Sequence, residues 1–156
     1  MSEHNYRLYS LANFYISPLA AGLQTAHVVS ELHNISADTT DTTAYDVWAR
    51  EDKTIIILNG GNHAGIVNAS LIMERAAKEL GVETAIFYED EQSLNGAATA
   101  TAIVLPEPIW GARKVAYNSG TGNEVLFVYD SEHGPVQYAS GPVYDLLVLI
   151  NSCRLF

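Results

Sequence analysis

The sequence predicts an α/β fold with a mixed, mainly parallel β-sheet flanked by helices. Strand-like β-branched runs alternate with segments in which apolar residues recur every three or four positions, as they do on one face of an amphipathic helix. The chain has 156 residues, the length of a single domain, and its hydrophobic content of 48 % is that of a packed globule. We therefore expect one α/β domain over residues 1–156.

The first elements expected are a strand, a helix and a second strand. Residues 6–15 mix aromatic and small residues and predict a strand that ends just before a helix. Ser17 is the expected N-cap of this helix, and Pro18 is its expected first residue, where the missing N–H of proline costs nothing. Helical spacing continues to about residue 34. Residues 54–58 form an unbroken β-branched run, which predicts a central strand buried on both faces.

The next elements complete a β-α-β-α-β-β order. Residues 66–80 have helical spacing and are followed by Gly81, the expected C-terminal cap. Residues 84–88 and 99–105 predict two further strands. The two strand–helix–strand passages predict parallel pairing, and the short connection between the last two strands predicts an antiparallel pair.

Residues 108–156 differ in kind from the preceding core of residues 6–107. Short strand-like segments joined by glycine-containing turns predict a β-meander, and the apolar residues 143–152 predict a C-terminal helix. We expect the meander and the helix to be appended to the core within the same domain.

The charge balance narrows the possible partners. Eight Lys and Arg residues stand against 18 Asp and Glu residues, which gives a net charge of −10. Counterion release from a long nucleic acid needs a Lys and Arg footprint, so we expect neither a long nucleic acid nor a membrane surface as partner. A single cysteine and an N-terminus without basic and apolar signal regions predict a cytoplasmic protein.

The first helix carries one pair of candidate site residues. Gln24 and His27 lie one helical turn apart and would form a polar spot near the strand ends, or alternatively a partly exposed pair without function. The five histidines contain no pair at metal-ligand spacing, so we expect no metal site. The acidic run at residues 89–91 predicts a solvated turn, because adjacent carboxylates on one loop splay apart, with a magnesium or acid–base site as the alternative.

Phe87 and Asn95 are a second candidate pair. An aromatic ring at a sheet edge and an amide on the following loop can stack on and hydrogen-bond a nucleobase, whereas a core phenylalanine and a turn asparagine are the alternative. The turn at residues 59–62 lies where α/β folds present N–H groups to anions, but it lacks a phosphate-binding fingerprint. No serine or cysteine nucleophile pattern is present in the sequence. We expect no catalytic residue and no cofactor.

Residues 6–107 resemble the type 2 peptidyl-tRNA hydrolase family. The resemblance rests on the Ser17-Pro18 turn, the GLQTAH stretch at residues 22–27, and the later stretches at residues 54–58, 66–80, 87–90 and 99–102. It implies that family's fold and a hydrolase site formed by His27, Gln24 and Asp90. The family relies on a lysine between the first strand and the helix, whereas residues 16–21 contain none.

A second resemblance covers nearly the whole chain and is to phage Thoeris anti-defence proteins of the first type. It rests on residues 17–32, 48–63, 87–107 and 153–155. It implies a non-enzymatic phage protein that sequesters cyclic ADP-ribose isomers in the cytoplasm of the infected bacterial host. It also implies an aromatic residue for adenine, matched by Phe87, an amide, matched by Asn95, and arginines for the diphosphate, matched by Arg113 and Arg154.

We therefore expect a homo-oligomer that binds a cyclic nucleotide signal and does not cleave it. The expected ligands are cyclic ADP-ribose isomers, with cyclic dinucleotides and trinucleotides as further candidates. The expected ligand-binding residues are Phe87, Asn95, Arg113, Arg154, Gln24 and His27. A hydrolase of the type 2 peptidyl-tRNA hydrolase kind and an interaction module without a small ligand are the alternatives.

Overall fold

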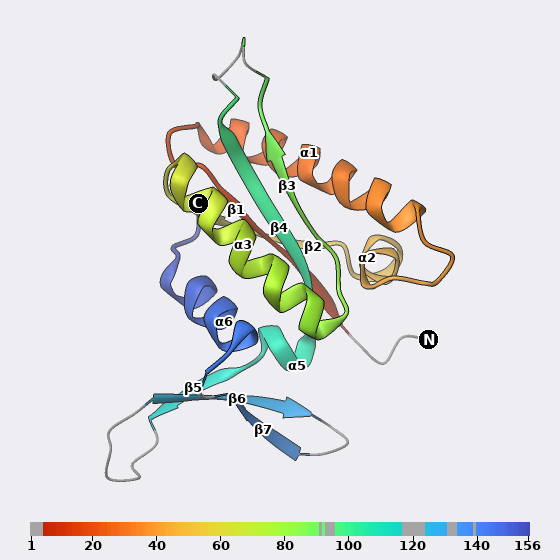
Figure 1. The fold of residues 1–156 in the computed structure, drawn as a ribbon, viewed down its shortest axis with the longest axis vertical. Helices are drawn as coiled ribbons and strands as arrows, with labels where there is room; N and C mark the ends of the chain where they lie inside the picture. The colour runs from red at the N-terminus through yellow and green to blue at the C-terminus, as the bar shows by residue number, and fades with distance from the viewer. Residues whose placement is uncertain (1–4, 91, 93–95, 117–123, 131–133, 139) are drawn as a thin grey trace.

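The computed structural model describes residues 5–90, 92, 96–116, 124–130, 134–138 and 140–156, and for residues 113–138 only the backbone elements. Its main body is a four-stranded sheet between two layers of helices (Figure 1). The strands run in the order β2-β1-β4-β3. They span Tyr6–Ala12 (β1), Thr54–Asn59 (β2), Thr84–Tyr88 (β3) and Ala98–Pro106 (β4).

The sheet is mixed, which confirms the α/β class. The expected mainly parallel pairing is wrong, because β1 is parallel to β2 but antiparallel to β4, and β3 is antiparallel to β4. The physical reason is the path of the chain after β2. The helix that follows β2 carries the chain to the opposite edge of the sheet. Strand β3 therefore pairs with β4 and not with β2.

The expectation that residues 54–58 form a central strand is also wrong, because β2 lies at an edge of the sheet. Ile55 in this strand is 43 % exposed, and only Leu58 is buried. The C-terminal residues cover part of the edge: Asn59 N donates to Arg154 O at 2.8 Å, and Phe156 N donates to Ile57 O at 3.0 Å.

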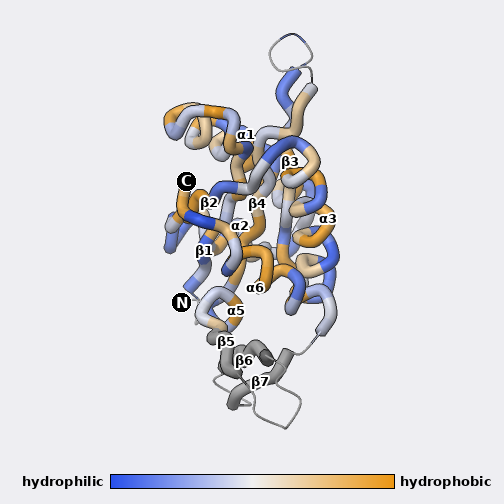
Figure 2. The backbone as a smooth tube through the Cα atoms, turned by 90° about the vertical axis from the view of Figure 1, so that its left-hand side faces the viewer, coloured by the Kyte–Doolittle hydropathy of each residue, from blue (hydrophilic) through white to orange (hydrophobic). Residues whose placement is uncertain are grey.

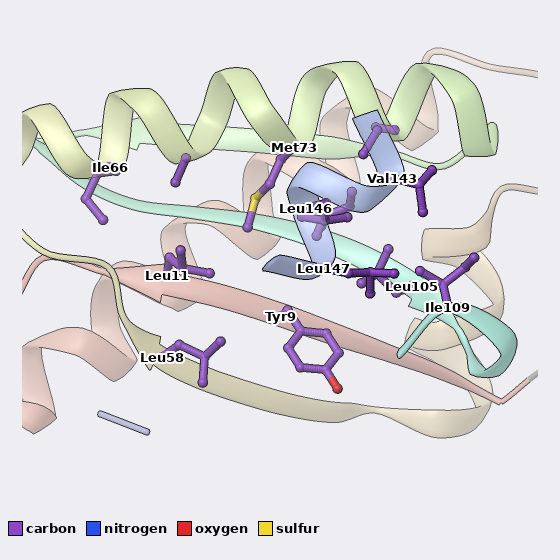
Figure 3. Close-up of a cluster of buried hydrophobic side chains, with 14 of the residues drawn as sticks. Tyr9, Leu11, Leu58, Ile66, Met73, Leu105, Ile109, Val143, Leu146 and Leu147 are labelled. Atoms are coloured by element: carbon purple, nitrogen blue, oxygen red, sulfur yellow. The ribbon is translucent and has the colours of Figure 1, made fainter. Parts of the chain in front are cut away.

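Helices cover the two faces of the sheet (Figure 2). One face is packed by α1 (Pro18–Ala37), α2 (Ala44–Val47) and the π-helical turn η1 (Trp48–Asp52). The other face is packed by α3 (His63–Leu80) and α6 (Pro142–Ser152). Figure 3 shows how side chains of α3 and α6 meet those of β1, among them Met73, Leu146 and Leu11.

The helix ends agree with the sequence pattern. Ser17 caps α1 by accepting from Ala20 N at 3.1 Å, and Pro18 is the first residue of the helix. Gly81 ends α3 with a φ of 69°, which is the left-handed conformation expected of a C-terminal glycine. Helix α3 begins at His63, three residues earlier than expected, because Asn62 caps it.

The remaining segments form the expected meander and C-terminal helix. The turn α5 (Glu107–Trp110) leads into β5 (Arg113–Ala116), β6 (Glu124–Asp130) and β7 (Gly134–Tyr138), which make an antiparallel three-stranded sheet. This small sheet lies at the end of the molecule opposite to the start of α3 (Figure 1). Among the described residues, no helix has the length and apolar character needed to cross a membrane.

Candidate ligand-binding site

Polar side chains and a cleft gather at one end of the four-stranded sheet. Strands β1, β2 and β3 run in the same direction and finish at this end, where β4 begins. The helices α1 and α3 also start here (Figure 1). In α/β folds, the carboxyl ends of the strands are where ligands bind.

Gln24 on α1 is the centre of a buried polar network. Its side chain is 8 % exposed. Its Nε2 donates to Glu89 Oε2 at 3.0 Å, and its Oε1 accepts from Thr99 Oγ1 at 2.9 Å. Both ends of the amide are therefore used to join α1 to the end of β3 and the start of β4.

A register shift brings Thr99 into this network. In the pairing of β3 with β4, Phe87 lies opposite Ala100 and Tyr88 lies opposite Ala98, so Thr99 is an extra residue in β4. Such a bulge redirects a side chain locally. The hydroxyl of Thr99 is fully buried and reaches Gln24.

His27 and Phe87 form a stacked pair beside the network. Their ring centroids are 4.5 Å apart and the ring planes differ by 12°. Phe87 is also packed against the apolar cluster between α1 and the sheet. Gln24, His27 and Phe87 are thus brought together, but the ring expected to stack on a nucleobase stacks on a histidine here. Its role in ligand binding stays a prediction.

The structure describes the other expected ligand residues only in part. Asn95 lies outside the described residues, and so does the side chain of Arg113. The backbone of Arg113 begins β5, in the small sheet at the opposite end of the molecule (Figure 1). Arg154 is exposed, and its carbonyl accepts from Asn59 N at 2.8 Å, so its backbone lies at the site end of β2.

A cleft of about 450 Å³ opens at this end of the sheet. Known pockets for small ligands measure about 300–1,000 Å³. The lining comes from the loop after β1, the start of α3 and the residue before β4: Asn13, Tyr15, Ile16, Asn62, His63, Ala64 and Ala97. The described lining therefore contains no carboxylate, lysine or arginine, and we refer to this site as the cleft.

Hydrogen bonds to the backbone hold the polar side chains of the cleft. Asn13 Oδ1 accepts from Tyr15 N at 2.9 Å, and Asn13 Nδ2 donates to Ala98 O at 3.3 Å. Asn62 Oδ1 accepts from Gly65 N at 2.9 Å. His63 Nδ1 accepts from Ala98 N at 2.8 Å. These bonds fix the cleft before any ligand arrives.

Tyr15 is the exposed aromatic residue of the cleft. It is 75 % exposed, and its ring centroid lies 3.9 Å from that of Phe14. A nucleobase can stack on such a ring. The sequence analysis did not identify Tyr15, Asn13 or His63 as site residues. It identified residues 59–62 only as a possible anion-binding turn. The one signal in the sequence was that all these residues lie at the end of a predicted strand or shortly after it.

Cys153 is the single cysteine of the chain and is partly buried at the end of α6. Burial raises the pKa of the Cys153 thiol, which lowers its thiolate fraction and makes it a poor nucleophile. Within the described part of the chain, no group of three or more His, Cys, Asp or Glu side chains can hold a metal ion.

No protein-family model and no curated protein matches this chain.

Proposed function

We propose that this protein binds a small cyclic nucleotide and holds it without cleaving it. The cleft carries the proposal, because it joins an exposed aromatic ring, Tyr15, to neutral hydrogen-bonding side chains. Hydrolysis needs a nucleophile or a paired acid and base. Among the described lining residues, His63 is the one imidazole, and its Nδ1 is bonded to a backbone amide rather than to a carboxylate.

Cyclic ADP-ribose isomers are the ligands we propose, with cyclic dinucleotides and trinucleotides as further candidates. Withdrawing a scarce signal requires nanomolar affinity, about −12 kcal/mol. One stacked base contributes about 1–3 kcal/mol and each hydrogen bond to a charged group about 1.5–3 kcal/mol, so a preformed pocket can reach this value. Sequestration of a bacterial immune signal by a phage protein is the biological role that we propose for such binding.

Calorimetry with cyclic ADP-ribose isomers tests the proposal. We expect nanomolar binding, a rise in melting temperature by mass action, and recovery of the intact ligand after heat denaturation of the protein. Absence of binding by every cyclic nucleotide, or recovery of a cleaved product, would contradict it.

Tyr15→Ala tests whether the ligand lies in the cleft. We expect affinity to fall about tenfold, the effect of one stacked base, with no change in melting temperature because the ring is 75 % exposed. Leu19→Ala is the matched control, since Leu19 is 77 % exposed nearby on α1 but does not line the cleft. Equal losses in both variants would place the ligand elsewhere.

A peptidyl-tRNA hydrolase is the second candidate, and the network of Gln24, Glu89 and Thr99 beside His27 favours it. The absence of a lysine from residues 16–21 speaks against it. Release of peptide from peptidyl-tRNA that disappears in Gln24→Ala would support the hydrolase. An interaction module without a small ligand predicts that no nucleotide raises the melting temperature.

A further inference from the structure

Asn13, Asn62 and His63 share one property that bears on what the cleft can bind. Each uses its hydrogen-bond acceptor on the protein's own backbone. Each keeps at least one N–H that the backbone does not take, because an amide nitrogen carries two hydrogens and a neutral imidazole carries one.

Asn13 is the buried member of this set. It is 6 % exposed and lines the cleft. Its Oδ1 accepts from Tyr15 N, and one hydrogen of its Nδ2 is directed to Ala98 O. The second Nδ2 hydrogen remains, and a buried N–H that lines a cavity favours an acceptor there.

Asn62 contributes an amide nitrogen, Nδ2, with both of its hydrogens available. Its Oδ1 is the cap of α3 and accepts from Gly65 N at 2.9 Å. Both hydrogens of its Nδ2 are left without a hydrogen-bond partner within the described part of the chain. The capping bond also fixes which end of the amide is the oxygen and which is the nitrogen.

His63 has its tautomer fixed by Ala98. Because Nδ1 accepts from Ala98 N at 2.8 Å, this nitrogen carries no proton, and the proton of the ring is on Nε2. Nε2 has no hydrogen-bond partner among the described residues. His63 therefore presents a donor to the cleft, and only a donor.

The geometry points to a cleft that selects an acceptor-rich anionic group, which we infer to be a phosphoryl group of the ligand. Phosphoryl oxygens at neutral pH are acceptors, so they match the remaining N–H groups of Asn13, Asn62 and His63. A ligand N–H donor placed against these N–H groups would find no acceptor on them, which is costly. The inference rests on the proposed function in one respect, namely that the molecule carrying the phosphoryl group is a cyclic nucleotide.

Neutral donors also explain how an acidic chain can hold an anion. The net charge is −10, and the described cleft lining contains no lysine or arginine. Hydrogen bonds from uncharged N–H groups do not depend on that net charge. Asn13, Asn62 and His63 are therefore specificity-determining residues for a phosphoryl group.

Asn62→Asp is the sharpest variant for this inference. Aspartate caps a helix as well as asparagine does, so Oδ1 still accepts from Gly65 N and α3 still forms. The two N–H donors are replaced by a carboxylate oxygen. Asn59→Asp is the matched control, because Asn59 caps Gly61 N in the same loop at 3.1 Å but does not line the cleft.

Inorganic pyrophosphate and adenosine are the probes, titrated into the full chain by calorimetry. We expect Asn62→Asp to weaken pyrophosphate binding about tenfold to a hundredfold, and Asn59→Asp to weaken it less than about threefold because solvent screens its charge. Adenosine binding should be the same in both variants. Equal weakening of pyrophosphate by the two variants, or no binding of pyrophosphate by the wild type, would overturn the inference.

Cyclic ADP-ribose separates this inference from the proposed function. If neither it nor any other cyclic nucleotide binds the wild type while pyrophosphate shows the expected contrast, the proposed function fails and the donor cleft stands. If cyclic ADP-ribose binds but Asn62→Asp and Asn59→Asp behave alike, the proposed function stands and the inference fails. Nitrogen NMR of His63 is a ligand-free check: a proton on Nε2 supports the inference, and a proton on Nδ1 overturns it.

Discussion

Gly60 in the loop after β2 and Gly65 in the first turn of α3 allow the loop and the helix to pack closely. A Cβ atom on Gly65 would lie 2.7 Å from the carbonyl oxygen of Gly60, and one on Gly60 would lie 2.5 Å from Ile66 Cδ1. The first turn of α3 is therefore packed directly on the loop that carries Asn62. This close approach holds the polar residues of the cleft against the end of the sheet.

Gly65→Ala should destabilise the protein by about 1–3 kcal/mol, because the backbone oxygen of Gly60 must move to admit the methyl group. Gly22→Ala is the control within α1. Apart from the adjacent residues and the backbone of its own helix, no atom lies within 4 Å of the position of its added Cβ. Alanine also favours the helix, so we expect a gain of about 0.5–1 kcal/mol. Urea unfolding measures both changes, and a shift of the same sign in both variants would contradict this account.

Residues of the site could be predicted only where the pattern is local. The pair Gln24 and His27 follows from helical spacing, and the structure joins it to Phe87. His63 and Asn13 both bond to Ala98, which lies 35 and 85 residues away along the chain. Composition and periodicity carry no information on a backbone partner at that separation.

At the level of elements, the sequence pattern predicts correctly which segments of the main sheet form strands, but not which strands lie next to each other. The run at residues 54–58 has the composition of a buried strand, yet β2 is at an edge. A β-branched run indicates that a segment favours a strand in a sheet. Which strands it pairs with depends on where the following helix ends relative to the sheet. The C-terminal residues then close part of that edge, through the bridge between Leu58 and Leu155.

Deletion of residues 154–156 should therefore weaken the protein and promote association. The deletion leaves Asn59 N–H and Ile57 C=O of the edge strand without their partners. Each lost hydrogen bond costs about 1 kcal/mol, and an open strand edge is a template for pairing between chains. Thermal unfolding with light scattering measures both effects.

Leu155→Ala is the control for this deletion, because it keeps the backbone bonds and removes a side chain that is 74 % exposed. We expect its melting temperature and light scattering to match those of the wild type. If it aggregates as the deletion does, the side chain and not the backbone pairing protects the edge.

At the scale of the whole molecule, the two expected phosphate-binding arginines belong to opposite ends. The backbone of Arg154 lies at the same end as the cleft, whereas β5, which Arg113 begins, lies at the other end (Figure 1). If Arg113 contacts the same ligand, it does so from a second copy of the chain. The expected homo-oligomer and the expected role of Arg113 are thus a single hypothesis.

Co-expression of two binding-deficient variants tests that hypothesis. In a dimer whose sites combine the cleft of one copy with Arg113 of the other, Arg113→Ala and Asn62→Asp each lower the affinity of both sites when present alone. Random mixing makes half of the dimers mixed, and each mixed dimer has one intact site, so about a quarter of the sites should regain wild-type affinity. Arg154→Ala with Asn62→Asp is the control, because Arg154 and the cleft share one copy and mixing restores nothing. Calorimetry with cyclic ADP-ribose measures the capacity of both mixtures; wild-type affinity in Arg113→Ala alone, or equal capacity in the two mixtures, would contradict a site shared between copies.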